Sequence, residues 1–205
     1  GGGAAGFGAA VAAARAGAKV ALIERYGSLG GLFTNGMVLI IIGTGVKEDG
    51  QFKLVTRGVC EEFMRRLEAM GEGAITKLEP NIGQPTADPE AAKVLMDDMV
   101  QEAKVDVFFH AWGVDVIQSG QSVQGVVFES KQGRQAVLAK VVVDASGDGD
   151  VFFQAGESYT QISHALGFVH RLGNVDRIDR TKAPKDTKLN LGGGEPLKSM
   201  RWVNS

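Results

Sequence analysis

The chain has 205 residues, of which 44% are hydrophobic, and its mean hydropathy is close to zero, as in a globular protein with enough apolar material for a core. The formal net charge of −2, without a cluster of basic residues, argues against nucleic acid and membrane surfaces as partners, and the longest apolar stretch, residues 37–42, is too short to cross a bilayer. The single cysteine, Cys60, excludes an internal disulfide and a CxxC redox pair, and it favours a reduced, cytoplasmic setting.

A glycine-rich turn opens the chain. Gly1, Gly3 and Gly6 have the G-x-G-x-x-G spacing, and an alanine-rich helix is predicted over residues 7–16. In such a turn the first glycine allows a tight turn out of a strand, the second lets the backbone approach a pyrophosphate, and the third lets the helix pack against the sheet. Unpaired N–H groups and the positive dipole end of the helix then face the phosphates. We therefore expect a bound dinucleotide here.

A strand is predicted over residues 19–24, and it ends on an acidic residue, Glu24. The carboxylate of Glu24 can accept hydrogen bonds from both hydroxyls of an adenosine ribose, which completes the dinucleotide fingerprint of a Rossmann-type fold. The alternative is that Glu24 caps the sheet end at the surface. A glycine-rich loop follows over residues 27–36, and its Gly30-Gly31 pair is expected to approach the cofactor.

A helix is predicted next over residues 55–70, because its apolar side chains are spaced three and four apart. A second helix is predicted from Asp88 to about residue 103, because Asp88 can cap it and Pro89 suits its first position. A strand is predicted over residues 105–110. The pattern then changes to three strands of an antiparallel meander, predicted over residues 114–118, 123–129 and 135–143.

The last meander strand runs into an acidic turn, residues 144–150, with the sequence Asp-Ala-Ser-Gly-Asp-Gly-Asp. This turn, the turn over residues 1–6 and the loop over residues 24–34 each follow the predicted carboxyl end of a parallel strand. Because those ends form one crevice in an open α/β sheet, we expect the three loops to converge on one long ligand. A solvated acidic turn or a cation site is the alternative, although the turn lacks the late bidentate glutamate of a calcium loop.

Together these three motifs resemble those of the FAD-dependent oxidoreductases of the glutathione-reductase structural type, over roughly residues 1–176. The resemblance implies an α/β fold: a three-layer Rossmann-like FAD/NAD(P)-binding domain with a central parallel sheet and an antiparallel β-meander, plus part of a second domain. We predict an FAD-binding domain over residues 1–156, whose first strand would precede Gly1. An incomplete substrate domain is predicted over residues 157–205.

The resemblance also implies the contacts of the cofactor, FAD. Glu24 would hold the adenosine ribose with Arg25 beside the adenine, and Gly113 or Val114 would meet the adenine through backbone groups. The pyrophosphate would be held by the opening turn through Gly1, Gly3, Ala4, Ala5 and Gly6. The residues along the flavin side would be Gly30, Gly31, Leu32, Phe33 and Thr34. The residues that close over the middle of FAD would be Ser146, Gly147 and Asp148.

The predicted function is that of an FAD-dependent oxidoreductase acting on a small-molecule substrate, with NAD(P)H as one candidate electron partner. Since FAD would carry the electron and hydride chemistry, no catalytic residue and no metal ligand are nominated. Two alternatives stay open. One is an NAD(P)-dependent dehydrogenase, which the meander disfavours, and the other is a non-catalytic FAD-binding module. The sequence assigns no substrate and no oligomeric state.

Four other residues have open roles. Cys60 is expected to be a buried structural thiol, because no histidine is adjacent to it. His164 and His170 lie six residues apart and would share one face of a strand, with a metal pair and a substrate-site role as lesser alternatives. Trp112 either stacks on adenine or packs at a sheet edge.

Overall fold

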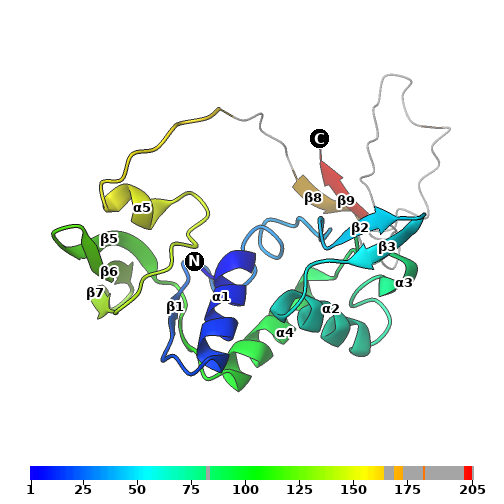
Figure 1. Ribbon diagram of the computed structural model, residues 1–205, viewed down its shortest axis with the longest axis horizontal. Helices are drawn as coiled ribbons and strands as arrows, with labels where there is room; N and C mark the ends of the chain where they lie inside the picture. The colour runs from blue at the N-terminus through cyan, green and yellow to red at the C-terminus, as the bar shows by residue number, and fades with distance from the viewer. Residues whose placement is uncertain (82–83, 164–168, 173–181, 183–200, 205) are drawn as a thin grey trace. The chain divides into compact units, whose positions relative to one another are not determined.

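The computed structural model describes all residues except 82–83, 164–168, 173–181, 183–200 and 205 (Figure 1). The chain divides into two compact units. The first unit comprises residues 1–31 and 96–164, and the second comprises residues 32–95 and 165–205. The predicted domain boundary at residue 156 stays a prediction.

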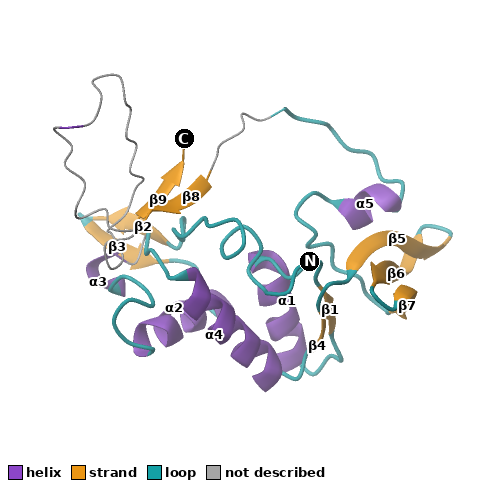
Figure 2. Cartoon of the chain, turned by 180° about the vertical axis from the view of Figure 1, so that it is seen from behind, coloured by secondary structure: helices purple, strands orange, loops and turns teal. Residues whose placement is uncertain are grey.

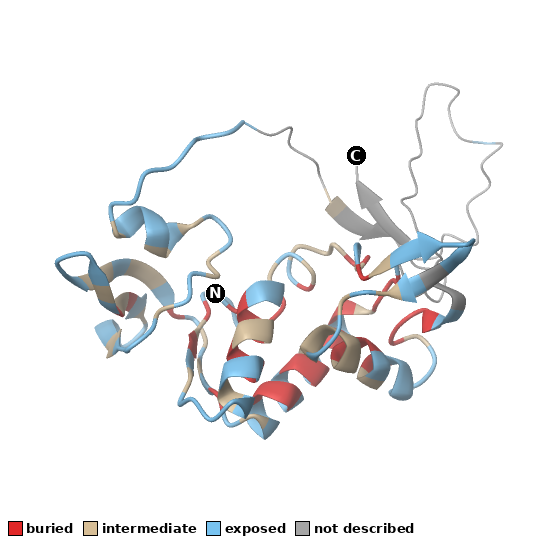
Figure 3. Ribbon diagram, viewed as in Figure 1, coloured by how far each residue is buried: buried red, intermediate tan, exposed pale blue. Residues whose placement is uncertain are grey.

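The first unit is built on a helix and two parallel strands. Helix α1 (Ala4–Arg15) packs on strand β1 (Ala21–Ile23), and β1 pairs in parallel with strand β4 (Asp106–Phe108). Figure 3 shows buried residues along α1, where the buried set is Gly6, Phe7, Ala10 and Val11. The small side chains of α1 let it approach the sheet closely. This parallel pairing and the meander described next confirm the predicted α/β fold.

The first unit also contains the predicted meander. Strands β5 (Trp112–Ser119), β6 (Ser122–Ser130) and β7 (Gly133–Leu138) form an antiparallel sheet in that order (Figure 2). The expectation of a third strand as far as residue 143 was wrong. Pairing of β7 with β6 ends where Leu138 lies opposite Gly125, so residues 139–143 form no strand with any described part of the chain. A short helix, α5 (Asp150–Gln154), follows the acidic turn.

The second unit contains a hairpin that the sequence analysis did not predict. Strands β2 (Gly45–Glu48) and β3 (Gln51–Leu54) pair antiparallel across a two-residue turn. The turn residues have positive φ angles, 51° at Asp49 and 82° at Gly50, as a type I′ turn requires. The Asp-Gly pair was therefore a readable hairpin signal.

Helix α2 (Val59–Ala69) starts four residues later than predicted. The N–H groups of Val55 and Thr56 donate to the carbonyl of Thr44, at 2.9 and 3.1 Å, and so extend the hairpin instead of opening the helix. Gly58 then has a φ of 69°, which is not helical. The apolar periodicity identified the helix, but backbone pairing set its start.

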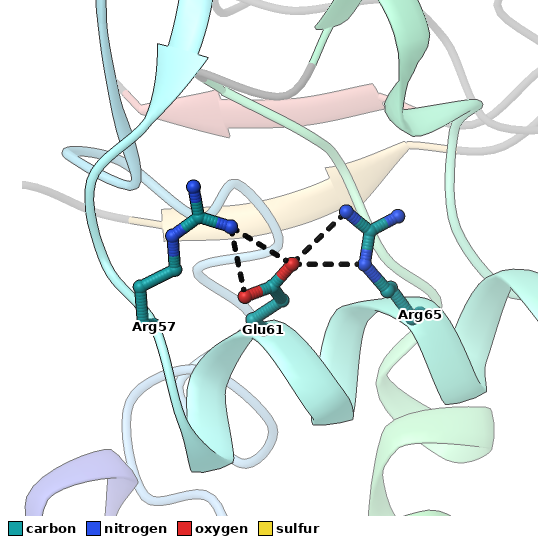
Figure 4. A network of polar contacts seen from close by, with 3 residues as sticks. All are labelled: Arg57, Glu61 and Arg65. Carbon is teal, nitrogen blue, oxygen red and sulfur yellow. Dashed lines mark hydrogen bonds and ion pairs between the residues drawn. The ribbon is translucent and has the colours of Figure 1, made fainter.

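On the exposed side of α2, Glu61 accepts hydrogen bonds from two arginines (Figure 4). Arg65 donates through Nε at 3.0 Å, and Arg57 donates through one nitrogen to both carboxylate oxygens at 3.2 Å. Hydrogen bonds from Arg65 and then Arg57 hold the pKa of Glu61 below its usual value. Because both arginine side chains are more than half exposed to water, we assign this network little weight in stability.

Helix α4 (Pro89–Glu102) begins in the second unit, and its residues from Met96 onward belong to the first. The predicted cap is confirmed, because Asp88 Oδ1 accepts from the N–H groups of Glu90 and Ala91, both at 3.0 Å. A short helical segment, α3 (Leu78–Asn81), precedes α4.

Near the end of the chain, strands β8 (Val169–Leu172) and β9 (Arg201–Asn204) pair antiparallel. His170 lies in β8, whereas His164 lies outside the described residues, so the predicted shared face is untested. Within the described ranges, no helix combines the length and the apolar composition that a bilayer crossing requires.

Candidate functional site

The opening turn presents the start of α1. Gly3 is the N-cap, and its carbonyl accepts the first helical hydrogen bond from the N–H of Phe7 at 2.8 Å. The Gly3 cap has no side chain to bond the first-turn N–H groups. Those groups, at Ala4, Ala5 and Gly6, lack acceptors within the helix because they stand in its first turn. A helix end of this kind favours an anion.

The glycines of this turn are needed for different reasons. A Cβ on Gly6 would overlap the carbonyl oxygen of Gly1, and a Cβ on Gly2 would lie 2.5 Å from the side chain of Leu29, so packing requires both glycines. Gly3 differs. Its φ of −64° suits any residue, and the nearest described atom to a Cβ there would be the Cα of Gly31, at 4.0 Å. The protein leaves open space beside Gly3 at the helix start.

The second glycine loop lies directly against the first. The N–H of Gly30 donates to the carbonyl of Gly2 at 2.8 Å, and Gly3 and Gly30 form a parallel bridge. Gly31 has a φ of 55°, and a Cβ on it would lie 3.0 Å from the Cα of Gly3. The predicted convergence of these two loops is therefore confirmed, and glycine at position 31 permits the close approach.

Glu24 joins the two loops through a buried carboxylate. Its side chain lies at the end of β1 with only 4% of the residue exposed, so it is no surface cap. Oε2 accepts from the N–H of Gly2 at 2.5 Å, and Oε1 accepts from the N–H of Tyr26 at 2.8 Å. Since each carboxylate oxygen can accept two hydrogen bonds, each keeps one further acceptor position.

Backbone hydrogen bonds continue beyond β1 and β4 and bring the start of β5 beside Glu24. The N–H of Glu24 donates to the carbonyl of Phe108 at 2.9 Å, and the N–H of Ala111 donates to the carbonyl of Glu24 at 3.0 Å. His110, between them, has a φ of 52°, and its ring covers Gly27, where a Cβ would lie 2.9 Å from two ring atoms. His110 thus packs on the loop that leads to the second glycine pair.

Strand β5 has an irregularity at one of the residues predicted to meet adenine. Gly113 lies opposite Phe128 and Asp115 lies opposite Val127, so the register passes over Val114. In a bulge of this kind one residue stands outside the ladder of backbone bonds. Between the two candidates, Val114 is therefore the one that the pairing of β5 with β6 passes over.

The acidic turn is held together by its own hydrogen bonds. Asp144 Oδ1 accepts from the N–H of Ser146 at 3.0 Å and from its hydroxyl at 2.6 Å, while Oδ2 accepts from the N–H of Phe152 at 2.9 Å. The hydroxyl of Ser146 accepts in turn from the N–H of Asp150 at 2.8 Å. Burial alone would raise the pKa of Asp144, but the hydrogen bonds from Ser146 and Phe152 outweigh it and hold that pKa below its usual value.

The same turn lies against the opening glycines. A Cβ on Gly1 would overlap the carbonyl oxygen of Ala145 and would lie 3.1 Å from the Cα of Ser146. Gly147, with a φ of 95°, and Asp148 are both exposed. The third predicted loop thus meets the first, as expected from the sequence.

The predicted flavin-side segment is divided between the two units. Residues 30–31 lie in the first unit against the opening turn. The rest of the segment lies in the second unit, where Leu32 is exposed, the ring of Phe33 packs edge-on against Phe63 with centroids 6.1 Å apart, and Thr34 is fully buried. The flavin-side role of these residues stays a prediction.

Other chemistry-bearing groups among the described residues belong to none of these loops. Among the described residues, no group of three histidine, cysteine or carboxylate side chains could hold a metal ion. Cys60 is half-buried, and burial raises the pKa of its thiol, which disfavours the reactive thiolate. A cavity of about 240 Å³, formed by α4 and β4, shares no residue with the loops; it is lined by Asp97, Val100, Gln101, Val105, Val107 and Phe109.

The network of the acidic turn can be tested by Ser146→Ala, which removes the hydroxyl that donates to Asp144. We expect the pKa of Asp144 to rise toward its ordinary value of about 3.9, measured by carbon-13 NMR titration of the carboxyl group. In the wild type, the contribution of Asp144 to stability is present above pH about 3.9 and is lost as the pH falls through the lower folded-state value. That acid-induced loss should be smaller in the variant. Ser130→Ala is the control, and an unchanged Asp144 titration in Ser146→Ala would contradict the network.

Comparison with known proteins agrees with this geometry. The sequence profile of a family described as FAD dependent oxidoreductase matches residues 1–177, whereas no curated protein sequence matches the chain. The crystal structure of THI4 from Thermovibrio ammonificans is similar with a TM-score of 0.53 and 22% identity, over 75% of this chain and 58% of that one. The structure of BexE, studied for oxidation during BE-7585A biosynthesis, is similar with a TM-score of 0.55 and 16% identity, over 100% of this chain and 42% of that one.

These two structures support the fold, and the chain spans only 58% and 42% of their lengths. The family is established by the profile, which covers all three converging loops. This chain therefore belongs to the FAD-dependent oxidoreductases, and FAD is its cofactor.

Proposed function

We propose that this chain is the dinucleotide-binding part of an oxidoreductase that uses FAD to exchange hydride or electrons with a small-molecule substrate. The open space beside Gly3 carries the proposal. Packing explains the glycines at positions 2 and 6, but the described structure has no packing need for glycine at position 3. A diphosphate bound at the start of α1 would explain the glycine at position 3, because its oxygen atoms would occupy the volume of a Cβ.

The residues present fit FAD along its adenosine half. The pyrophosphate would lie between Gly3 and the first-turn N–H groups of α1. The ribose would use the remaining acceptor positions of Glu24, and the adenine would use Arg25 and the backbone of Val114 or Gly113. Burial of the Glu24 carboxylate supports this assignment, since a desolvated acceptor binds hydroxyl donors strongly.

Two further sets of residues complete the proposed cofactor site. Ser146, Gly147 and Asp148 would close over the middle of the cofactor, next to Gly1. The flavin side is assigned to Gly30 and Gly31 and, by the resemblance stated above, to residues 32–34. The bound flavin supplies the redox chemistry itself, and the chain binds and orients it. No residue is nominated as catalytic, and a substrate domain over residues 157–205, an NAD(P)H partner and a cytoplasmic location remain predictions.

The matched pair Gly3→Ala and Gly8→Ala tests the cofactor site. Apart from chain neighbours and the helix's own backbone, neither new Cβ has a described atom nearer than 4.0 Å, so both variants should fold. Alanine should make α1 slightly more stable at position 8, inside the helix, and slightly less stable at position 3, its N-cap. Only the Cβ at position 3 would enter the phosphate volume. We expect Gly3→Ala to weaken FAD binding at least tenfold, about 1.4 kcal/mol, and Gly8→Ala to leave it unchanged, measured by equilibrium titration. Wild-type affinity in a folded Gly3→Ala variant would refute the proposal.

The redox activity is tested on the FAD-loaded chain under anaerobic conditions. Addition of NADH or NADPH should bleach the flavin absorbance, and a quinone should then restore it; dithionite, which reduces any flavin, is the control. A bound flavin that dithionite bleaches but that neither NADH nor NADPH reduces would instead support the non-catalytic module. Binding of NAD without any flavin binding would support the dehydrogenase alternative.

A further inference from the structure

The cavity between α4 and β4 has a largely apolar lining. Its volume is about 240 Å³, room for roughly eight water molecules, because each takes about 30 Å³ in the liquid. Val100 and Val105 are the buried part of the lining, with 3% and 9% of each residue exposed. Val107 and Phe109 are half-buried. All lining residues belong to the first unit, so the cavity lies within one unit.

The two polar side chains of the lining, Asp97 and Gln101, come from α4. Residues four apart in a helix are neighbours on one face, so this carboxylate and this amide lie next to each other on the helix surface. An ionised carboxylate only accepts hydrogen bonds, and the amide of Gln101 can turn its carbonyl oxygen toward the same point. Two acceptors beside an apolar lining suit a ligand that has a donor group at one end and an apolar body.

Asp97 has no counterion among the described residues. Lys93, one turn earlier in α4, pairs with Glu90 at 3.0 Å instead, and no described lysine or arginine forms an ion pair with Asp97. Burial raises the pKa of Asp97 above its usual value, and the neighbouring carboxylate of Asp98 raises it further. Both effects oppose the negative charge of Asp97, so a cation bound beside it would offset them.

Other classes of small ligand fit this lining less well. An anion would be repelled by the carboxylates of Asp97 and Asp98, and a purely apolar ligand would leave the Asp97 carboxylate without a partner. A hard metal ion requires more oxygen ligands than one carboxylate and one amide, and the described residues contain no group of three metal-ligating side chains. An organic cation has neither difficulty.

We propose that the cavity between α4 and β4 binds a small organic cation, with its ammonium group at Asp97 and Gln101 and its apolar body against Phe109 and the valines. The ammonium group donates to the carboxylate and to the amide carbonyl oxygen. This site is separate from the proposed cofactor site, because its lining shares no residue with the three converging loops.

The test titrates the full chain with three probes of one shape: cyclohexylmethylammonium, cyclohexylmethanol and cyclohexanecarboxylate. Methyl NMR signals of Val100, Val105 and Val107 report binding in the cavity. The ammonium probe should bind at least about tenfold tighter than the alcohol, since hydrogen bonds to charged groups are stronger than neutral ones, and the carboxylate probe should not bind. Valine signals unmoved by the ammonium probe, or equal affinity for the ammonium probe and the alcohol, would overturn the inference.

Asp97→Asn and Asp98→Asn form a matched pair of variants. Each removes one negative charge from α4 and keeps the size of the side chain, but only Asp97 lines the cavity. Asp97→Asn should weaken the ammonium probe by about tenfold. Asp98→Asn should change its affinity by less than about twofold in about 0.15 M salt, which screens charges outside the cavity. Equal effects would reveal only a general attraction to the charge of α4 and would overturn the site.

Gln101 allows a second pair of variants. Gln101→Lys places a competing ammonium group next to Asp97 and should abolish binding of the ammonium probe, whereas Gln101→Glu adds a second carboxylate and should tighten it. Lysine and glutamate favour helix about as well as glutamine does, so α4 should stay folded in both. Wild-type affinity in Gln101→Lys would contradict the proposed position of the ammonium group.

FAD titrations separate this inference from the proposed function. The FAD affinity of Asp97→Asn should equal that of the wild type, and Gly3→Ala should bind the ammonium probe as the wild type does. Loss of both ligands in Asp97→Asn would mean that the variant disturbs the whole unit, and it would overturn a separate site. FAD binding insensitive to Gly3→Ala would refute the proposed function and leave the cation site standing.

Discussion

The buried carboxylate of Glu24 is the interaction on which the geometry of the site depends. A carboxylate out of water is costly unless hydrogen bonds compensate for the lost solvation. Here the N–H groups of Gly2 and Tyr26 satisfy one acceptor position on each oxygen and tie the opening turn to the loop after β1. The N–H of Gly30 donates to the carbonyl of Gly2, so the second glycine loop is bonded to the opening turn as well. One acidic side chain thus positions the start of α1 and remains available to a ligand.

Much of this site could be predicted because its parts are local in sequence. The glycine spacing, the helix after it and the acid at the end of β1 form one short segment, and each part has a steric or electrostatic requirement that few residues meet. The cap at Asp88 was readable for the same reason, since a cap and its helix are adjacent. Asp49-Gly50 was equally local, and its hairpin could have been predicted.

Other features depend on which strands pair, which a local pattern does not reveal. The bulge at Val114 exists only in relation to β6, and the contact of Arg25 with Trp112 joins segments far apart in the chain. The helix predicted over residues 55–70 begins only at Val59, because residues 55 and 56 bond to Thr44 and extend the hairpin. The predicted strand over residues 135–143 likewise ends early, because the pairing of β7 with β6 stops where Leu138 lies opposite Gly125, although the apolar pattern continues to residue 143. Tertiary pairing overrides propensity in each case.

The most direct test of this account is the FAD dissociation constant of Glu24→Gln, compared with wild type and with Glu129→Gln as an exposed control. Glutamine keeps the shape of the side chain but replaces one carboxylate oxygen by an NH₂ group, which accepts no hydrogen bond. Either one of the two backbone N–H donors or a ribose hydroxyl then loses its acceptor. The account predicts binding weakened by at least about tenfold in Glu24→Gln and unchanged in Glu129→Gln. A dissociation constant for Glu24→Gln equal to that of the wild type would contradict it.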